Sequence, residues 1–388
     1  MTNGKERLFS LDALRGLDML FLCVVQPLVV AAANGWGFAD PAKHPFMRQF
    51  AHYWGGFTAY DLIMPLFIFM CGAAVPFALP KRLDDRGHPT PAFWKHIAWR
   101  VVMLWVIGMA SQGNLLTFDW RKFAYFSNTL QSIAVGYVIA ALVLLIRSPR
   151  IRLAVPFVLA GIYGLSLHFG GDYSVSGNFA MKVDVAFVRV LQPVLGHDSG
   201  YYSWYWTSLM FGAMTLCGML SAQTLLSARS PWRKVAWLAG SGAAVWLSGL
   251  ILEKLGVPCI KHIFTVSFTA QAMGICVLLL AALYVVNDIW RFRRGWWVVT
   301  LYGQTALASY VLGEMFRSIP TAVSEALLGG LATRIGGPWG MFVVQIGTVF
   351  ALTFFLGVWR RASKGVDFGR QQQADAIEKN VNGFGKMV

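Results

Sequence analysis

The residues best suited to chemistry lie in the stretch from Phe50 to Leu79. His52 and Trp54 precede two glycines, and an apolar run long enough to cross a membrane follows. One carboxylate, Asp61, stands where that run begins, and a charged group at membrane depth is costly enough to mark a candidate functional site. A carboxylate can fix the tautomer of an imidazole and make it a better base. We therefore expect His52 and Asp61 to be catalytic and Trp54 to offer a flat surface to substrate; the alternative is an inert loop histidine.

Uncharged polar groups and one further cation open other apolar segments. Asn128 and Gln131 stand at the start of one such segment, on the same side as His52, and Lys261 stands before another. Helix capping would explain each of them separately. Together they predict one polar cavity that binds substrate.

Charged residues also gather where two apolar segments begin on the opposite side. Asp12 and Arg15 are three residues apart and can pair on one helix face, and Lys95 and Arg100 precede a later segment. They fit an ordinary helix start and topology signals, but the basic groups also suit the phosphates of a nucleotide cofactor. We take these four residues as candidates for cofactor binding.

The composition indicates a polytopic α-helical membrane protein. Of 388 residues, 56% are hydrophobic and 13% charged, against about 25% charged in a soluble domain. The mean hydropathy is +0.55. The net charge of +15 comes from Lys and Arg in short loops, so it indicates membrane topology and no nucleic-acid partner. Five scattered cysteines form no metal-binding pattern, and we expect no metal.

The apolar segments predict ten membrane spans, or eleven if residues 317–337 hold a further one. Alternate loops carry 23 of the 33 Lys and Arg residues, which places both termini in the cytoplasm. Residues 1–361 would form a single transmembrane domain, and 362–388 a polar, partly disordered cytoplasmic tail. The expected spans are 14–33, 57–79, 96–112, 129–147, 152–169, 204–226, 233–253, 264–287, 296–316 and 338–359.

Five motifs in this order resemble the transmembrane N-acetyltransferase family of heparan-α-glucosaminide N-acetyltransferase and its bacterial relatives. The resemblance covers about residues 8–315 and is best in the first 140. The motifs are SLDALRG at 10–16, HYWGGFTAYDLIMPLFIFMCG at 52–72, KHIAWR at 95–100, NTLQSIAVGY at 128–137 and PCIKHIFTVS at 258–267.

The resemblance implies that acetyl passes from cytosolic acetyl-CoA to a glucosamine amine across the membrane. The active histidine of the family falls on His52, its motif aspartate on Asp61, and a family asparagine on Gln26. The interval from His52 to Trp54 is one residue shorter than in the lysosomal enzyme, so the acceptor is expected to differ. The resemblance further implies a homodimer, and we expect a bacterial inner-membrane location with an amino sugar or related glycan as acceptor.

Two other functions fit the same polar groups. One is a transporter or flippase of the same fold without chemistry, and the other is an O-acetyltransferase of envelope glycans. Within the acetyltransferase hypothesis, His52 either carries the acetyl group transiently or only deprotonates the acceptor amine. Arg15, Lys95 and Arg100 would hold the phosphates of acetyl-CoA, while Gln26, Asn128 or Gln131 would hydrogen-bond the thioester carbonyl.

Overall fold

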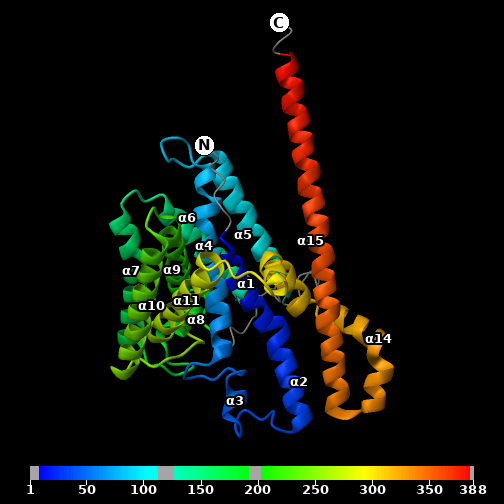
Figure 1. Cartoon of the computed structure of the whole chain (residues 1–388). Helices are drawn as coiled ribbons and strands as arrows, with labels where there is room; N and C mark the ends of the chain where they lie inside the picture. The colour runs from blue at the N-terminus through cyan, green and yellow to red at the C-terminus, as the bar shows by residue number, and fades with distance from the viewer. Residues whose placement is uncertain (1–7, 112–125, 192–201, 385–388) are drawn as a thin grey trace. The chain divides into compact units, whose positions relative to one another are not determined.

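The computed structural model describes residues 8–111, 126–191 and 202–384. Helices account for 77% of the described residues, among which no strand occurs, in agreement with the expected all-α class. Figure 1 shows the helices with their labels. The principal helices are α1 (Phe9–Leu20), α2 (Gln26–Trp36), α4 (Ile63–Ala78), α5 (Pro91–Ser111), α6 (Thr129–Leu144), α7 (Pro149–Gly170), α8 (Phe179–Leu191), α9 (Ser208–Leu226), α10 (Pro231–Lys254), α11 (Val266–Tyr284), α12 (Trp297–Gln304), α13 (Ala306–Tyr310), α14 (Ser318–Ile335) and α15 (Gly337–Phe384).

Seven helical stretches within the described ranges are long and apolar enough to cross a membrane, as a polytopic membrane protein requires. Each coincides with one of the expected spans. The stretches are Phe9–Trp36, Ala59–Ala78, Pro149–Gly170, Ser208–Leu226, Pro231–Lys254, Val266–Ile289 and Gly337–Ser363.

The other three expected spans have a different form. Helix α5 is 21 residues long, but its N-terminal half carries two charged residues, Lys95 and Arg100. Helix α6 is apolar and has 16 residues, fewer than the roughly 20 that cross a bilayer directly. The span expected at 296–316 is broken at Thr305, between α12 and α13, and ends in a π-helical turn, η6 (Val311–Met315). A total of ten spans and the cytoplasmic position of both termini therefore stay predictions.

The stretch left open for an eleventh segment, 317–337, contains the helix α14. It packs along α15, where the hydroxyl of Ser324 donates to the carbonyl oxygen of Val344 at 2.7 Å. The polar residues from 362 onward continue α15 as a helix as far as Phe384. The expectation of a partly disordered tail is therefore wrong for the backbone of 362–384, since the helical hydrogen-bond ladder of α15 simply continues.

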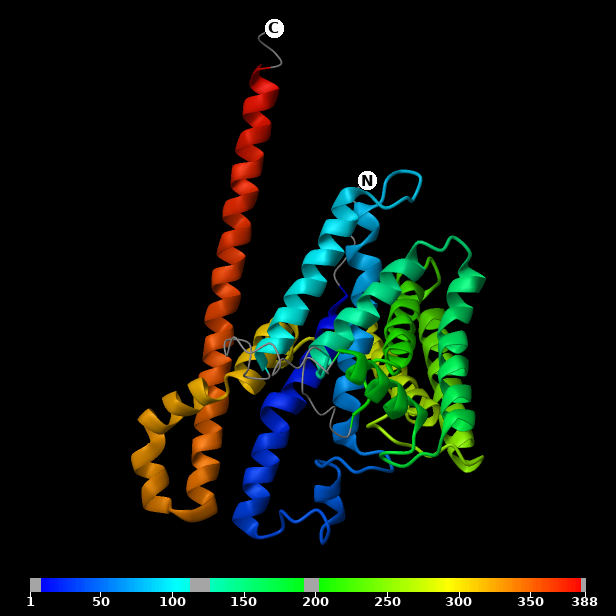
Figure 2. The ribbon, with the colours of Figure 1, turned by 180° about the vertical axis from the view of Figure 1, so that it is seen from behind.

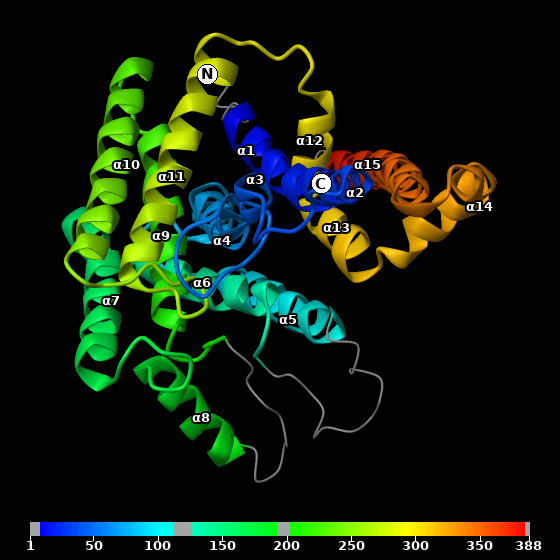
Figure 3. The same ribbon diagram turned by 90° about the horizontal axis from the view of Figure 1, so that it is seen from below.

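The chain divides into two compact units, and the single domain expected over 1–361 stays a prediction. The first unit contains Met1–Leu14 and Pro45–Phe292, and the second contains Arg15–His44 and Arg293–Val388. In the first unit α4 lies in the middle, with α6, α9 and α11 around it (Figure 3). Because α4 is apolar on all sides, it has no face suited to water and is buried.

Small residues let α4 and α9 approach closely. A Cβ atom on Gly72 would lie 1.8 Å from the carbonyl oxygen of Thr215, and one on Gly218 would lie 1.9 Å from that of Phe69. Contacts of this kind replace the hydrophobic driving force that is missing between helices in lipid. This crossing fixes α4, and the N-terminal end of α4 carries Asp61 through the turn η2 (Ala59–Leu62).

Four helices of the first unit, α7, α9, α10 and α11, run side by side when viewed from the front and from behind (Figures 1 and 2). In the most apolar part of α7 and of α10, only 11% and 17% of the residues are buried. The corresponding shares for the stretches of α9 and α11 are 67% and 61%. The outer pair is therefore apolar and exposed, as expected of helices that face lipid.

The second unit contains helices from both ends of the chain. Trp36 at the end of α2 packs edge-on against Trp339 of α15, with ring centroids 5.2 Å apart. Arg317 donates to the side-chain oxygen of Gln345 at 2.9 Å, which ties the start of α14 to α15. Polar and aromatic contacts thus hold α2, α14 and α15 together.

Candidate functional site

Asp61 is fixed by a capping box at the turn η2, just before α4. The backbone N–H of Thr58 donates to Oδ2 of Asp61 at 3.0 Å, and the hydroxyl of Thr58 donates to the same oxygen at 2.8 Å. Asp61 is completely buried. A buried carboxylate requires such donors, and this arrangement leaves its second oxygen, Oδ1, for another partner.

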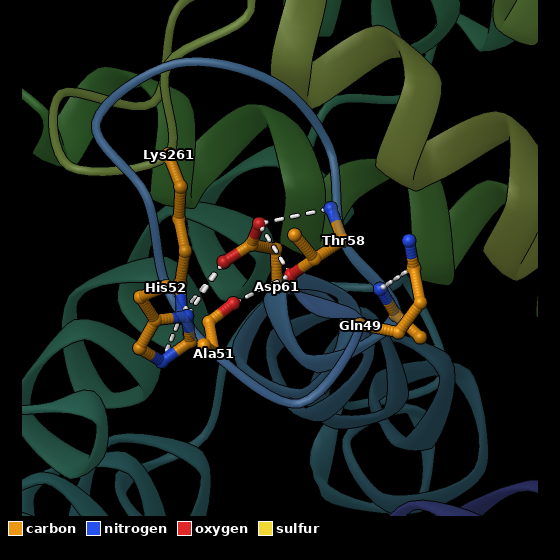
Figure 4. Close-up of polar contacts among 7 residues, drawn as sticks. Gln49, Ala51, His52, Thr58, Asp61 and Lys261 are labelled. Carbon is orange, nitrogen blue, oxygen red and sulfur yellow. Dashed lines mark hydrogen bonds and ion pairs between the residues drawn. The ribbon is translucent and has the colours of Figure 1, made fainter. Parts of the chain in front are cut away.

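That partner is His52. Its Nδ1 lies 2.6 Å from Oδ1 of Asp61 (Figure 4). Because an ionised carboxylate can only accept, the contact places a proton on Nδ1 and leaves Nε2 as the basic nitrogen. The imidazole also stacks on the ring of Tyr60, with centroids 4.6 Å apart. The side chain of His52 is 31% exposed although Asp61 is not exposed at all, so the oriented base remains accessible.

Lys261 approaches the same imidazole from the loop between α10 and α11. Its Nζ lies 2.9 Å from Nε2 and 3.1 Å from Nδ1 of His52, and 3.5 Å from Oδ1 of Asp61. The two loops are joined by the backbone N–H of Gly56, which donates to the carbonyl oxygen of Cys259 at 2.8 Å. Burial lowers the pKa of Lys261 to about 8, although Asp61 acts in the opposite direction. A carboxylate, an imidazole and an amine therefore lie within hydrogen-bonding distance of one another.

A group of three rings, Trp54, His262 and Tyr202, forms an aromatic wall. The rings of Trp54 and His262 are stacked at 5.3 Å, and those of His262 and Tyr202 lie 4.5 Å apart. The indole N–H of Trp54 donates to the carbonyl oxygen of Tyr173 at 3.2 Å. Burial, and secondarily the charge of Lys261, lowers the pKa of His262, which favours its neutral form. His262 is adjacent to Lys261 in the chain, so one loop supplies both the cation and part of the wall.

Asp184 of α8 holds the chain segment that follows Tyr202. Its carboxylate accepts hydrogen bonds from the hydroxyl of Ser203 at 3.2 Å and from the backbone N–H groups of Trp204 and Tyr205 at 2.5 and 3.1 Å. Asp184 is completely buried, and burial raises its pKa to about 6 against the opposing effect of these donors. This carboxylate positions the segment that carries Tyr202.

The amides expected to bind substrate on α6 have structural partners. Asn128 caps α6 by accepting from the backbone N–H groups of Leu130 and Gln131, and it donates to the carbonyl oxygen of Gly108 at 2.6 Å. The side-chain oxygen of Gln131 accepts from the backbone N–H of Ser127 at 2.7 Å. A substrate contact at either residue would have to exchange one of these bonds.

The basic residues expected at the cofactor differ in environment. Lys95 is exposed on α5, whereas Arg100 lies over the ring of Tyr137, 4.6 Å from its centroid, with Nη2 3.6 Å from Sγ of Cys71. Three buried polar atoms here lack a hydrogen-bond partner among the described residues. They are Nε of Arg100, Nε2 of His96 and the hydroxyl oxygen of Tyr137. Unsatisfied buried donors are costly, so this cluster is suited to a polar ligand.

The remaining expected residues belong to the N-terminal helices. Asp12 is buried in the first unit, while Arg15 and Gln26 are half-buried in the second. Their expected roles at the cofactor and the substrate stay predictions.

Four residues of the site were not recognised from the sequence: Thr58, Tyr60, Asp184 and His262. The T-x-x-D pattern at 58–61 is a capping-box signal and could have assigned Thr58. The stacking of Tyr60 on His52 depends on the turn η2, which places Tyr60. The hydrogen bonds that Asp184 accepts join α8 to a segment about 20 residues further along the chain. No local pattern reports such contacts.

Comparison with known proteins adds little to the geometry. A family model described as a domain of unknown function, DUF5009, matches residues 7–143, which include His52 and Asp61. No curated protein matches the chain. Among the described residues no group of three or more His, Cys, Asp and Glu side chains could hold a metal ion.

Proposed function

We propose that the chain is a transmembrane acetyltransferase that moves acetyl from cytosolic acetyl-CoA to an amino sugar or related carbohydrate across the membrane. The observation that carries the proposal is the contact of His52 with both Asp61 and Lys261. A buried carboxylate that orients an accessible imidazole is the arrangement general base or nucleophilic catalysis needs.

Two routes use the same nitrogen. In the first, Nε2 of His52 bonds to the thioester carbonyl carbon, and the carbon–sulfur bond breaks to release the CoA thiolate. The acceptor nitrogen then bonds to the same carbon, the bond to Nε2 breaks, and the proton lost by the amine balances the charge of the thiolate. In the second, Nε2 removes a proton from the amine as its nitrogen bonds to the carbonyl carbon, and the proton passes to the departing thiolate. In both, the ammonium of Lys261 is placed to stabilise the oxygen that gains negative charge.

The unpartnered buried atoms beside Arg100 support a binding site for the polar parts of acetyl-CoA in the first unit. Arg100 could donate to a phosphate or carbonyl oxygen, and Tyr137 and His96 add further polar groups there. Lys95 is near in sequence and exposed, so it could reach the outermost phosphates.

The aromatic wall supports a carbohydrate acceptor, because flat rings can stack on the apolar faces of sugars. Trp54 and Tyr202 are only partly buried, so one face of the wall remains for such a contact.

A transport function is the second candidate. The interruption at Thr305, followed by the π-helical turn η6, gives the second unit a discontinuous helix of the kind that forms ion and substrate sites in transporters. Substrate flux without acetyl transfer would favour this candidate over the enzyme.

The test is incubation of purified protein with radiolabelled acetyl-CoA and glucosamine, with wild type beside His52→Ala and the loop control His88→Ala. We expect labelled N-acetylglucosamine from wild type and from the control, and almost none from His52→Ala. Label retained on wild-type protein without acceptor identifies the two-step route, and a base-labile product identifies an ester. Failure of wild type to bind acetyl-CoA would overturn the enzyme proposal.

A further inference from the structure

A cavity of about 1000 Å³ lies among α7, α9, α10 and α11 in the first unit. It follows α7 from Pro149 to His168, a rise of about 28 Å at 1.5 Å per residue. This length is close to the roughly 30 Å thickness of bilayer hydrocarbon. Most of its lining side chains are apolar, including Leu153, Phe157 and Val245. The cavity therefore has the length and the surface that a lipid chain requires.

The helices on its two sides, α7 and α10, are the least buried of the seven apolar stretches. Gly161 on α7 lines the cavity, and a Cβ atom there would meet nothing within 4 Å. The cavity is therefore open space beside helices whose apolar faces are exposed, and lipid can enter it from the surrounding hydrocarbon.

One end of the cavity carries the charge. Among the described lining residues, Arg229 is the only Arg or Lys, and its guanidinium lies 4.8 Å from the ring centroid of Trp237, which also lines the cavity. The polar side chains of Gln223 and Thr224, in the last turn of α9, line the same end and precede Arg229 by six and five residues. The cation can pair with the phosphate of a phospholipid, and the tryptophan suits the interfacial ester region beside it. The apolar channel suits the acyl chains.

We propose that this cavity is a binding site for an anionic phospholipid, with its acyl chains along the apolar wall and its phosphate at Arg229 and Trp237. The proposal does not depend on acetyl transfer. The positive charge at one end, with a mostly apolar lining elsewhere, distinguishes this occupant from an uncharged hydrocarbon.

The test titrates detergent-purified, delipidated full-length protein with phosphatidylglycerol or phosphatidylcholine and counts bound lipids by native mass spectrometry. Two variants address the site: Arg229→Gln removes the charge, and Gly161→Leu fills the cavity. Each has a matched control. Arg233→Gln removes an exposed cation from the start of α10, and Gly240→Leu adds the same side chain at an exposed glycine that has open space and does not line the cavity.

We expect wild type to bind phosphatidylglycerol about fivefold more tightly than phosphatidylcholine, the preference that one interfacial cation confers. Arg229→Gln should lose this preference, Gly161→Leu should lower binding of both lipids, and the controls should behave as wild type. Equal affinity of wild type for the two lipids, or unchanged binding by Gly161→Leu, would overturn the proposal. So would a wild-type dimer that Gly161→Leu dissociates, since a second copy would then occupy the cavity.

Discussion

Lys261 lies 2.9 Å from Nε2 of His52, although the two residues are 209 positions apart in the chain. The contact places a buried amine beside the nitrogen that Asp61 leaves basic. The ammonium of Lys261 is therefore placed to donate a hydrogen bond to an oxyanion that develops beside Nε2.

Asp61→Asn should reduce acetyl transfer strongly without unfolding the protein. An amide in place of the carboxylate can donate to Nδ1, which would put the ring proton on Nε2 and remove the base. We expect the kcat to fall by about 100- to 10,000-fold, the usual value of general base catalysis. The exposed Asp85→Asn is the control, and circular dichroism checks helicity. Activity within about threefold of wild type would show that Asp61 does not orient the base.

The buried amine of Lys261 predicts a pH dependence of stability. Its pKa is about 8 in the folded protein, below the ordinary value of 10.5, so the unfolded chain binds this proton more tightly between those values. The unfolding free energy should therefore rise as pH increases from about 8 to 10.5, by up to about 3 kcal/mol.

Lys261→Met should remove this rise, and the exposed Lys254→Met should retain it. The measurement is the thermal midpoint in detergent at several pH values across the window. An identical pH profile for wild type and Lys261→Met would contradict the assignment of a buried, weakly basic amine.

The sequence predicted the main features of the fold because long apolar segments can only be satisfied as membrane helices. Among the described residues, the seven long apolar helices coincide with expected spans. The break at Thr305 escaped prediction because residues 296–316 are apolar on both sides of it, and hydropathy does not register a change of helix type. The continuation of α15 beyond residue 361 was also missed, since polar composition alone indicated a partly disordered tail.

At the site, sequence spacing was informative only over short distances. His52 and Asp61 are nine residues apart, and the pair could be proposed from that spacing. The position of Lys261 at the imidazole depends on a loop 209 residues away, so its charge suggested a role in the cavity but no contact. Asn128 differs from Lys261, because its partners are local. It caps α6, so an amide that was expected to bind substrate already has hydrogen-bond partners close by in the chain.

Asp184→Ala should destabilise the segment that carries Tyr202. Loss of the carboxylate leaves backbone N–H groups of Trp204 and Tyr205 without their acceptor, which should lower the unfolding free energy by about 1–3 kcal/mol. If the aromatic wall binds acceptor, the KM for acceptor should rise more than the kcat falls. The exposed Asp85→Ala should change neither. An unchanged thermal midpoint for Asp184→Ala would show that this carboxylate does not hold the segment.

Gly218→Ala should weaken the crossing of α4 and α9. The new methyl group would lie 1.9 Å from the carbonyl oxygen of Phe69, so the helices must separate, at a cost of about 1–3 kcal/mol. The control is Gly240→Ala, where nothing lies within 4 Å and stability should be unchanged or higher. Thermal unfolding followed by tryptophan fluorescence compares them. Equal midpoints would contradict the close approach.

Sided transfer in sealed vesicles tests the central claim most directly. Protein is reconstituted with glucosamine trapped inside, radiolabelled acetyl-CoA is added outside, and labelled sugar inside is counted. Wild type should accumulate N-acetylglucosamine inside the vesicles. The initial rate of this accumulation should be about 100- to 10,000-fold lower for His52→Ala. Equal accumulation by His52→Ala would contradict the assigned base, and passage of glucosamine out of the vesicles without acetylation would contradict the enzyme itself.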